Sequence, residues 1–169
     1  MSNRAKIGLG NDSRNDSNPC VAKSDARGIA YGVRLRNIRE STGRSPQEVA
    51  DRLGISLLEY DELEAIAGTL NRSTSLTQLL QLSSVLNVST RFIFEDEGRE
   101  NDRISCKELC TNIKSYLERT GTGISEFEER VGYEIRQTLE DPAKVMDWNV
   151  DCLRFVCSEI GTNWLTALP

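Results

Sequence analysis

The chain has 169 residues, of which 38% are hydrophobic and 28% charged, and its formal net charge is −5. This composition is typical of a globular protein with one ordinary domain or two small ones. Histidine is absent, which removes the commonest general base and metal imidazole. The sequence also has no glycine-rich phosphate loop, serine elbow or acidic metal cluster. We therefore expect no enzymatic activity and no cofactor.

The N-terminal segment is polar and contains few apolar side chains. This composition is typical of disorder, so we predict a disordered tail over residues 1–28. No apolar stretch approaches the ~20 residues that a membrane helix needs, and the N-terminus has no apolar core of a secretion signal. We therefore expect a cytoplasmic protein that makes no membrane contact.

Capping boxes mark the starts of several expected helices. In this motif a serine side chain accepts a hydrogen bond from the backbone three residues later, where Glu or Gln returns the bond. Apolar residues at helical spacing follow, and no alternating strand pattern of comparable strength occurs. The sequence therefore predicts an all-α protein, in which residues 92–94 are either a scrap of strand or a last helical turn. The five expected boxes are Ser45/Glu48, Ser56/Glu59, Ser75/Gln78, Ser105/Glu108 and Ser125/Glu128.

The stretch from Val33 to Phe94 resembles the Cro/CI-type (XRE-like) helix-turn-helix family. Its second helix carries a small residue followed by a glycine, here Ala50 and Gly54. A small residue allows close helix packing, and glycine readily adopts a left-handed turn. Glu64 falls where the family usually has a structural glutamate. The resemblance implies a five-helix bundle over residues 29–98. The family's first-helix pattern, LRxxRExxG, is matched by Leu35, Arg36, Arg39, Glu40 and Gly43.

The resemblance implies a DNA-binding transcriptional regulator. In this family the third helix enters the major groove, and the N-terminus of the second helix contacts phosphate. The family reads paired half-sites, so the resemblance also implies a homodimer. The implied DNA-contacting residues lie on the first helix and its end, at the start of the second helix and along the third. They are Arg36, Arg39, Arg44, Ser45, Pro46, Gln47, Ser56, Leu57, Leu58, Glu59, Asp61 and Glu62.

The expected recognition helix departs from a typical DNA-binding surface. Residues 57–64 contain four acidic side chains and no lysine or arginine, and Pro46 stands where the family often has glutamine. Phosphates repel acidic side chains, although a carboxylate can accept a hydrogen bond from cytosine. Leu57 and Leu58 suit thymine methyl groups or a protein partner. The alternative function is therefore a protein-interaction regulator, such as an anti-activator or an immunity-like protein, that kept the fold and lost DNA binding.

The second half repeats features of the first after a charged linker, which we place at residues 99–104. Thr42-Gly43 recurs as Thr120-Gly121, and Arg52-Leu53-Gly54 recurs as Arg130-Val131-Gly132. We therefore predict a second, degenerate helix-turn-helix-like helical domain over residues 105–169. Coincidence between two unrelated helical segments is the alternative.

The second copy differs from the first at positions that matter for packing. Glu128 stands at the position of Ala50, where a carboxylate obstructs close packing unless the helices splay apart. Its third helix is short, because Pro142 stops it. Arg136 and Gln137 remain able to reach bases or phosphates. We nevertheless favour a protein contact for this half, for dimerisation or for ligand sensing.

The cysteines do not indicate a disulfide framework. Their number is odd and the chain shows no secretion signal. Cys106 and Cys110 share a helix face, and Cys152 and Cys157 lie in the last long helix. If those helices are neighbours, the four thiols converge, as a zinc or redox site would require. The spacings differ from the usual C-x2-C, and the alternative is that they are small buried hydrophobes.

Overall fold

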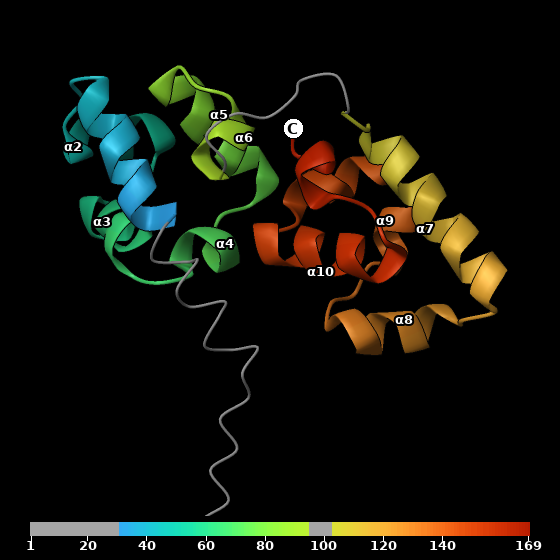
Figure 1. Ribbon diagram of the computed structural model, residues 1–169. Coiled ribbons are helices and arrows are strands. Elements are labelled where there is room, and N and C mark those ends of the chain that lie inside the picture. The colour runs from blue at the N-terminus through green and yellow to red at the C-terminus, as the bar shows by residue number, and fades with distance from the viewer. Residues whose placement is uncertain (1–30, 95–102) are drawn as a thin grey trace, which may run out of the picture.

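The computed structural model describes residues 31–94 and 103–169, which form helices and no β-strand (Figure 1). The prediction of an all-α protein is therefore confirmed for this part of the chain. The predicted tail, residues 1–28, lies outside the described residues, and so does most of the predicted linker. No helix in the described ranges is long and apolar enough to cross a membrane.

The first half begins with a helix that spans residues 31–41. The chain then turns at Gly43, which has a left-handed φ of 69°. Short helices follow, and residues 92–94 form the end of the last of them, so they are a helical turn rather than a strand. These helices are α2 (Pro46–Leu53), α3 (Leu57–Ala65), α4 (Thr69–Ser73), α5 (Leu76–Leu86) and α6 (Thr90–Phe94).

The second half has a similar succession of elements. A long helix opens it, and a short helix ends just before Asp141 and Pro142, as the proline predicts. The chain ends in an eleven-residue helix followed by a 3₁₀ turn. The elements are α7 (Cys106–Thr120), α8 (Ile124–Val131), α9 (Arg136–Glu140), η2 (Pro142–Asp147), α10 (Val150–Ile160) and η3 (Trp164–Ala167).

Four of the five expected capping boxes are present, at the starts of α2, α3, α5 and α7. The fifth prediction is wrong. Helix α8 begins at Ile124 after the N-cap residue Gly123, so Ser125 lies inside the helix. The Glu128 carboxylate instead accepts hydrogen bonds from the backbone N–H groups of Ile135 and Arg136, both at 2.9 Å. It turns toward α9 because the first N–H groups of that helix have no partner within the helix.

The two halves share one hydrophobic core. Helix α10 packs on α4, and η2 packs on α5 (Figure 1). The backbone N–H of Leu76 donates to the carbonyl oxygen of Trp148 at 2.8 Å. The rings of Phe94 and Trp164 meet edge to face, with centroids 5.3 Å apart. Side chains and backbone groups of both halves therefore hold them together.

Candidate nucleic-acid interface

Helices α2 and α3 form a compact pair joined by a short, well-capped turn. Ser45 caps α2 and Ser56 caps α3, each in a complete capping box. Between them Gly54 adopts a left-handed φ of 69°, and its N–H donates to the carbonyl groups at the end of α2. Ala50 is fully buried, and α2 packs against α3 and α5. The small residue and the glycine thus lie where the sequence predicts them.

Helix α3 has a buried face and an exposed face. Tyr60, Leu63 and Glu64 are buried in the core. On the opposite side Leu57 is 39% exposed and Leu58 is 69% exposed. Asp61 is exposed on this side, and Ile66, just after the helix, is 51% exposed. The outward surface of α3 therefore combines acidic and apolar side chains.

Arg39 and Glu64 form a buried, two-pronged ion pair. Arg39 Nε donates to Glu64 Oε1 at 2.7 Å, and Arg39 Nη2 donates to Glu64 Oε2 at 3.0 Å. The two side chains are only 8% and 3% exposed. Burial by itself raises the pKa of the Glu64 carboxyl, but the hydrogen bonds and charge of Arg39, together with Tyr60 and Arg36, outweigh burial and hold that pKa below its usual value. Arg39 therefore joins the first helix to α3 and does not present its guanidinium to solvent.

The other two arginines of the expected interface are more accessible. Arg36 Nε donates to Glu64 Oε2 at 3.2 Å, and 47% of the Arg36 side chain is exposed. Arg44 is half-buried, and its Nε atom has no hydrogen-bond partner within the described ranges. Its carbonyl oxygen accepts a bond from Arg39 Nη1 at 3.0 Å. The side chains of Arg36 and Arg44 thus have parts that can still reach a ligand.

The start of α2 is open to solvent. Ser45 and Gln47 are exposed, and Pro46 is half-buried at the first helical position. Gln47 Nε2 donates to Asp51 Oδ1 at 2.7 Å. Helix N-termini carry partial positive charge and attract anions. The expected phosphate-contacting residues are therefore accessible at this end of α2.

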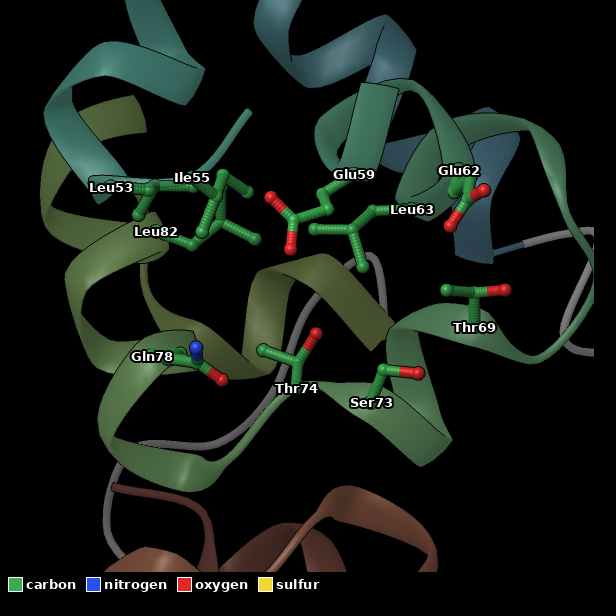
Figure 2. A pocket seen from close by; sticks show the side chains of 10 residues that line it. All are labelled: Leu53, Ile55, Glu59, Glu62, Leu63, Thr69, Ser73, Thr74, Gln78 and Leu82. Atoms are coloured by element: carbon green, nitrogen blue, oxygen red, sulfur yellow. The ribbon is translucent and has the colours of Figure 1, made fainter. Parts of the chain in front are cut away.

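Two of the expected contact residues, Glu59 and Glu62, line a cavity between α3, α4 and α5 (Figure 2). The Glu59 carboxylate accepts bonds from the N–H and hydroxyl of Ser56, which lower the pKa of the Glu59 carboxyl. This side chain stays ionised at neutral pH and caps the helix.

The second half presents a different surface at α9. Arg136 and Gln137 are exposed. Arg136 Nη2 donates to Ser125 Oγ at 2.9 Å and lies 3.6 Å from Glu128 Oε2. Lys144 Nζ donates to Gln137 Oε1 at 2.9 Å. The polar side chains of α9 are thus engaged with neighbouring groups of the same half.

The four described cysteines are free thiols, and Cys20 lies outside the described residues. Burial raises the thiol pKa values of Cys152 and Cys157 to about 12 and also raises those of Cys106 and Cys110. Within residues 31–94 and 103–169, no group of three potential ligands is placed to hold a metal ion. The arrangement fits small buried hydrophobes, because the reactive thiolate form is disfavoured.

Sequence reasoning missed the structural roles of Arg39 and Glu128. A signal for the first was present, since a buried glutamate at position 64 needs a cationic partner and the first helix supplies arginines. The role of Glu128 was hidden by the false capping box, because Ser125 and Glu128 have the right spacing.

Comparisons with known proteins do not identify a family. No family model matches the chain, and no solved structure matches it. Among curated proteins, the chain is similar to the protein translocase subunit SecA of Malacoplasma penetrans (strain HF-2), with 23% identity over 111 residues. These residues make up 66% of this chain and 8% of that protein, so the chain spans less than a tenth of the length of the protein it matches.

Proposed function

We propose that this chain is a DNA-binding transcriptional regulator of Cro/CI type, whose first half carries the helix-turn-helix. The observation that carries the proposal is the free outward face of α2 and α3. The second half packs on α4 and α5, so α2 and α3 lie away from the junction (Figure 1). A recognition helix needs such an uncovered face to enter the major groove.

In this proposal α2 contacts the DNA backbone and α3 contacts the bases. The N-terminus of α2 is exposed to a phosphate, although Ser45 and Gln47 already donate to Glu48 Oε2 and Asp51 Oδ1, and Arg44 adds positive charge beside it. On α3, Leu57 and Leu58 are suited to thymine methyl groups. Few cations are available, so we expect weak non-specific affinity that falls with salt along a shallow slope.

A protein-interaction regulator is the second candidate, and the exposed leucines of α3 favour it. Leu58 is the most exposed of the large hydrophobic residues in the described ranges, and acidic side chains accompany it along the helix. Arg39, which could have countered that charge, is buried with Glu64. An apolar and acidic helix face suits a protein partner with an apolar, basic groove.

The second half is, in this proposal, a degenerate copy that takes the place of a second subunit. Gly54 and Gly132, 78 residues apart, both end a helix in the left-handed conformation. Ser75 and Asn149, 74 residues apart, both cap an eleven-residue helix. The separation of matching residues falls from 78 to 74 along the chain, as small deletions in the second copy would cause.

The junction supports this reading, because each half contributes the same pair of elements. Helix α10 packs on α4, and α5 packs on η2, where η2 and α10 correspond in order to α4 and α5. Ser75 and Asn149, the matching N-cap residues, face each other in an isolated antiparallel bridge. Contact of a surface with its own equivalent is the arrangement of a two-fold dimer. We therefore propose one chain with two joined modules instead of the homodimer that the family resemblance implies.

A gel-shift titration of the full chain tests the function. We expect sequence-dependent shifts at ~50 mM salt that weaken as salt rises. Arg44→Gln should weaken binding to all sequences, whereas Arg119→Gln, an exposed arginine of α7, is the matched control. Asp61→Asn should increase non-specific binding, because it removes repulsion from the backbone phosphates.

The same titration separates the two candidates. Complete absence of a shift at low salt would remove the DNA-binding proposal and leave the protein-interaction one. In that case Leu58→Asp should abolish capture of the partner while the thermal melt of the chain stays unchanged.

A further inference from the structure

A cavity of about 290 Å³ lies between the α2–α3 turn and helices α3, α4 and α5 (Figure 2). Its volume is at the lower end of the range for small-molecule sites. Its walls are of two kinds, one apolar and one polar with two carboxylates. The cavity therefore has the composition of a site for a small ligand with an aliphatic part and a charged part.

The apolar wall comes from the end of α2, from α3 and from α5. Leu53, Ile55 and Leu82 lie together on one side, and Leu63 lies across from them (Figure 2). Leu63 and Leu82 belong to the core, and Leu53 and Ile55 are half-buried against it. These side chains give a ligand's carbon chain a fixed apolar surface.

The polar wall carries negative charge. Glu59 and Glu62 line the cavity, and no lysine or arginine is among its lining residues. Both hydrogen bonds that Glu59 accepts from Ser56 use Oε2, so Oε1 remains for a ligand. Figure 2 shows the Glu59 carboxylate pointing into the cavity. A cation in this space meets attraction from two carboxylates and no repulsion from the wall.

Thr74 gives an independent indication of a ligand. This residue is 4% exposed and lines the cavity, and its hydroxyl makes no hydrogen bond within the part of the chain that the structure describes. Its oxygen points into the cavity from the side opposite Glu59 (Figure 2). The oxygen itself keeps contact with the cavity, so a donor placed there would give it a hydrogen-bond partner.

We propose that this cavity binds a small primary aliphatic amine. Its ammonium group lies between Glu59 Oε1 and Thr74 Oγ1 and donates to both, while Glu62 adds negative charge at the rim. The carbon chain lies against Leu53, Ile55 and Leu82. An ammonium group has three donors and no acceptor, which suits a carboxylate and a hydroxyl that can both accept a hydrogen bond.

Such a ligand would connect the first turn of α3 with the junction between α4 and α5. Glu59 belongs to the capping box of α3, and Thr74 directly follows α4. Bound amine therefore stabilises the orientation of α3. The binding itself does not depend on whether α3 contacts DNA or protein, so it can be tested without either partner.

The test is a calorimetric titration of the full chain with pentylamine at low ionic strength. We expect saturable binding of pentylamine, and at least ~tenfold weaker binding of pentanol, which lacks the charge. Glu59→Gln and Thr74→Val should each weaken the affinity for pentylamine ~tenfold. Glu62→Gln should weaken it as well without touching any helix cap.

Glu48→Gln is the matched control. Glu48 occupies the same capping-box position on α2 as Glu59 does on α3, and it does not line the cavity. Glutamine still serves a capping box, so both variants should melt alike. The proposal is overturned if pentylamine does not saturate the protein, if pentanol binds equally well, or if Glu48→Gln weakens binding as much as Glu59→Gln.

Discussion

The pair of Arg39 and Glu64 shows how one contact can decide the role of an arginine. Glu64 is buried on α3, and an unpaired carboxylate there would be strongly unfavourable. Arg39 satisfies both of its oxygens and also donates to the carbonyl of Arg44. This network fixes α3 against the first helix and against the turn that precedes α2. Arg39 thus supports the candidate interface from a buried position.

Arg39→Ala should destabilise the protein strongly. It leaves a buried, uncompensated carboxylate, which typically costs about 3–5 kcal/mol in the free energy of unfolding. Urea denaturation at neutral pH measures the loss, with Arg36→Ala, at the half-exposed partner of Glu64, as the control. An equal and small effect of both substitutions would contradict the structural role of Arg39.

The Glu64 ion pair should also make the free energy of unfolding depend on pH. The pKa of Glu64 is lower in the folded protein than its ordinary value. Its contribution is therefore complete above the ordinary carboxyl pKa, about 4.3, and is lost as the pH falls through the folded pKa. We expect the stability difference between wild type and Glu64→Gln to be large at neutral pH and to shrink below about pH 4. Urea titrations across this range will measure it.

The Glu128 carboxylate on α8 caps the start of α9, because it accepts bonds from the backbone N–H groups of Ile135 and Arg136. Glu128→Ala should lower the free energy of unfolding by about 0.5–2 kcal/mol, the usual cost of a lost helix cap. Amide hydrogen exchange should quicken at Ile135 and Arg136, whose N–H groups it binds. Glu129→Ala, at an exposed neighbouring position, provides the control. Unchanged exchange at the two amides would show that Glu128 is not the cap.

At the scale of single elements, the sequence predicted most helix starts and the α2–α3 turn. Serine caps and left-handed glycines are local signals, so Ser45, Ser56 and Gly54 could be interpreted without knowing their distant neighbours. The capping box at Ser125 was predicted wrongly because α8 begins earlier, with Gly123 at its N-cap position, and the first N–H groups of α9 lie within reach of Glu128. Which backbone N–H groups the Glu128 carboxylate accepts from therefore depends on tertiary packing.

Ala50 is a fully buried small residue on α2, the helix that packs against both α3 and α5. Ala50→Glu should unfold or loosen the first half, because Ala50 is fully buried and leaves no room for a carboxylate. Circular dichroism melts will measure the change. In the second half α9 packs mainly on α7 and η2, and the half-buried Glu128 bridges from α8 to α9. Glu128→Gln should therefore be much milder than Ala50→Glu.

At the scale of the whole molecule, the sequence did not predict how the halves meet. Repeated motifs indicated a second helical half, but they contain no information on which faces pack together. The bond from Leu76 to Trp148 and the contact of Phe94 with Trp164 join residues that are far apart in the chain. The cavity at Thr74 could not be predicted from the sequence either, because its walls come from four separate segments.

We expect the full chain to be a monomer of 18.9 kDa in solution. The second half covers α4 and α5, and in the proposed two-module arrangement it takes the place of another copy there. Light scattering after size-exclusion chromatography, repeated over a wide range of protein concentrations, measures the mass. A mass of two chains that falls on dilution would contradict the proposed joining of two modules.

Because α6 and α7 are joined in one chain, the pairing of the two halves does not depend on protein concentration. Two separate subunits must find each other, so their pairing falls away on dilution by mass action. Two halves of one chain have an effective concentration that the connecting segment sets, and dilution does not change it. If the chain is the proposed regulator, occupancy of its target below saturation would rise in proportion to the number of molecules present, without the quadratic dependence of a dissociating pair. Its output would follow gradual changes in expression, even at a few copies per cell.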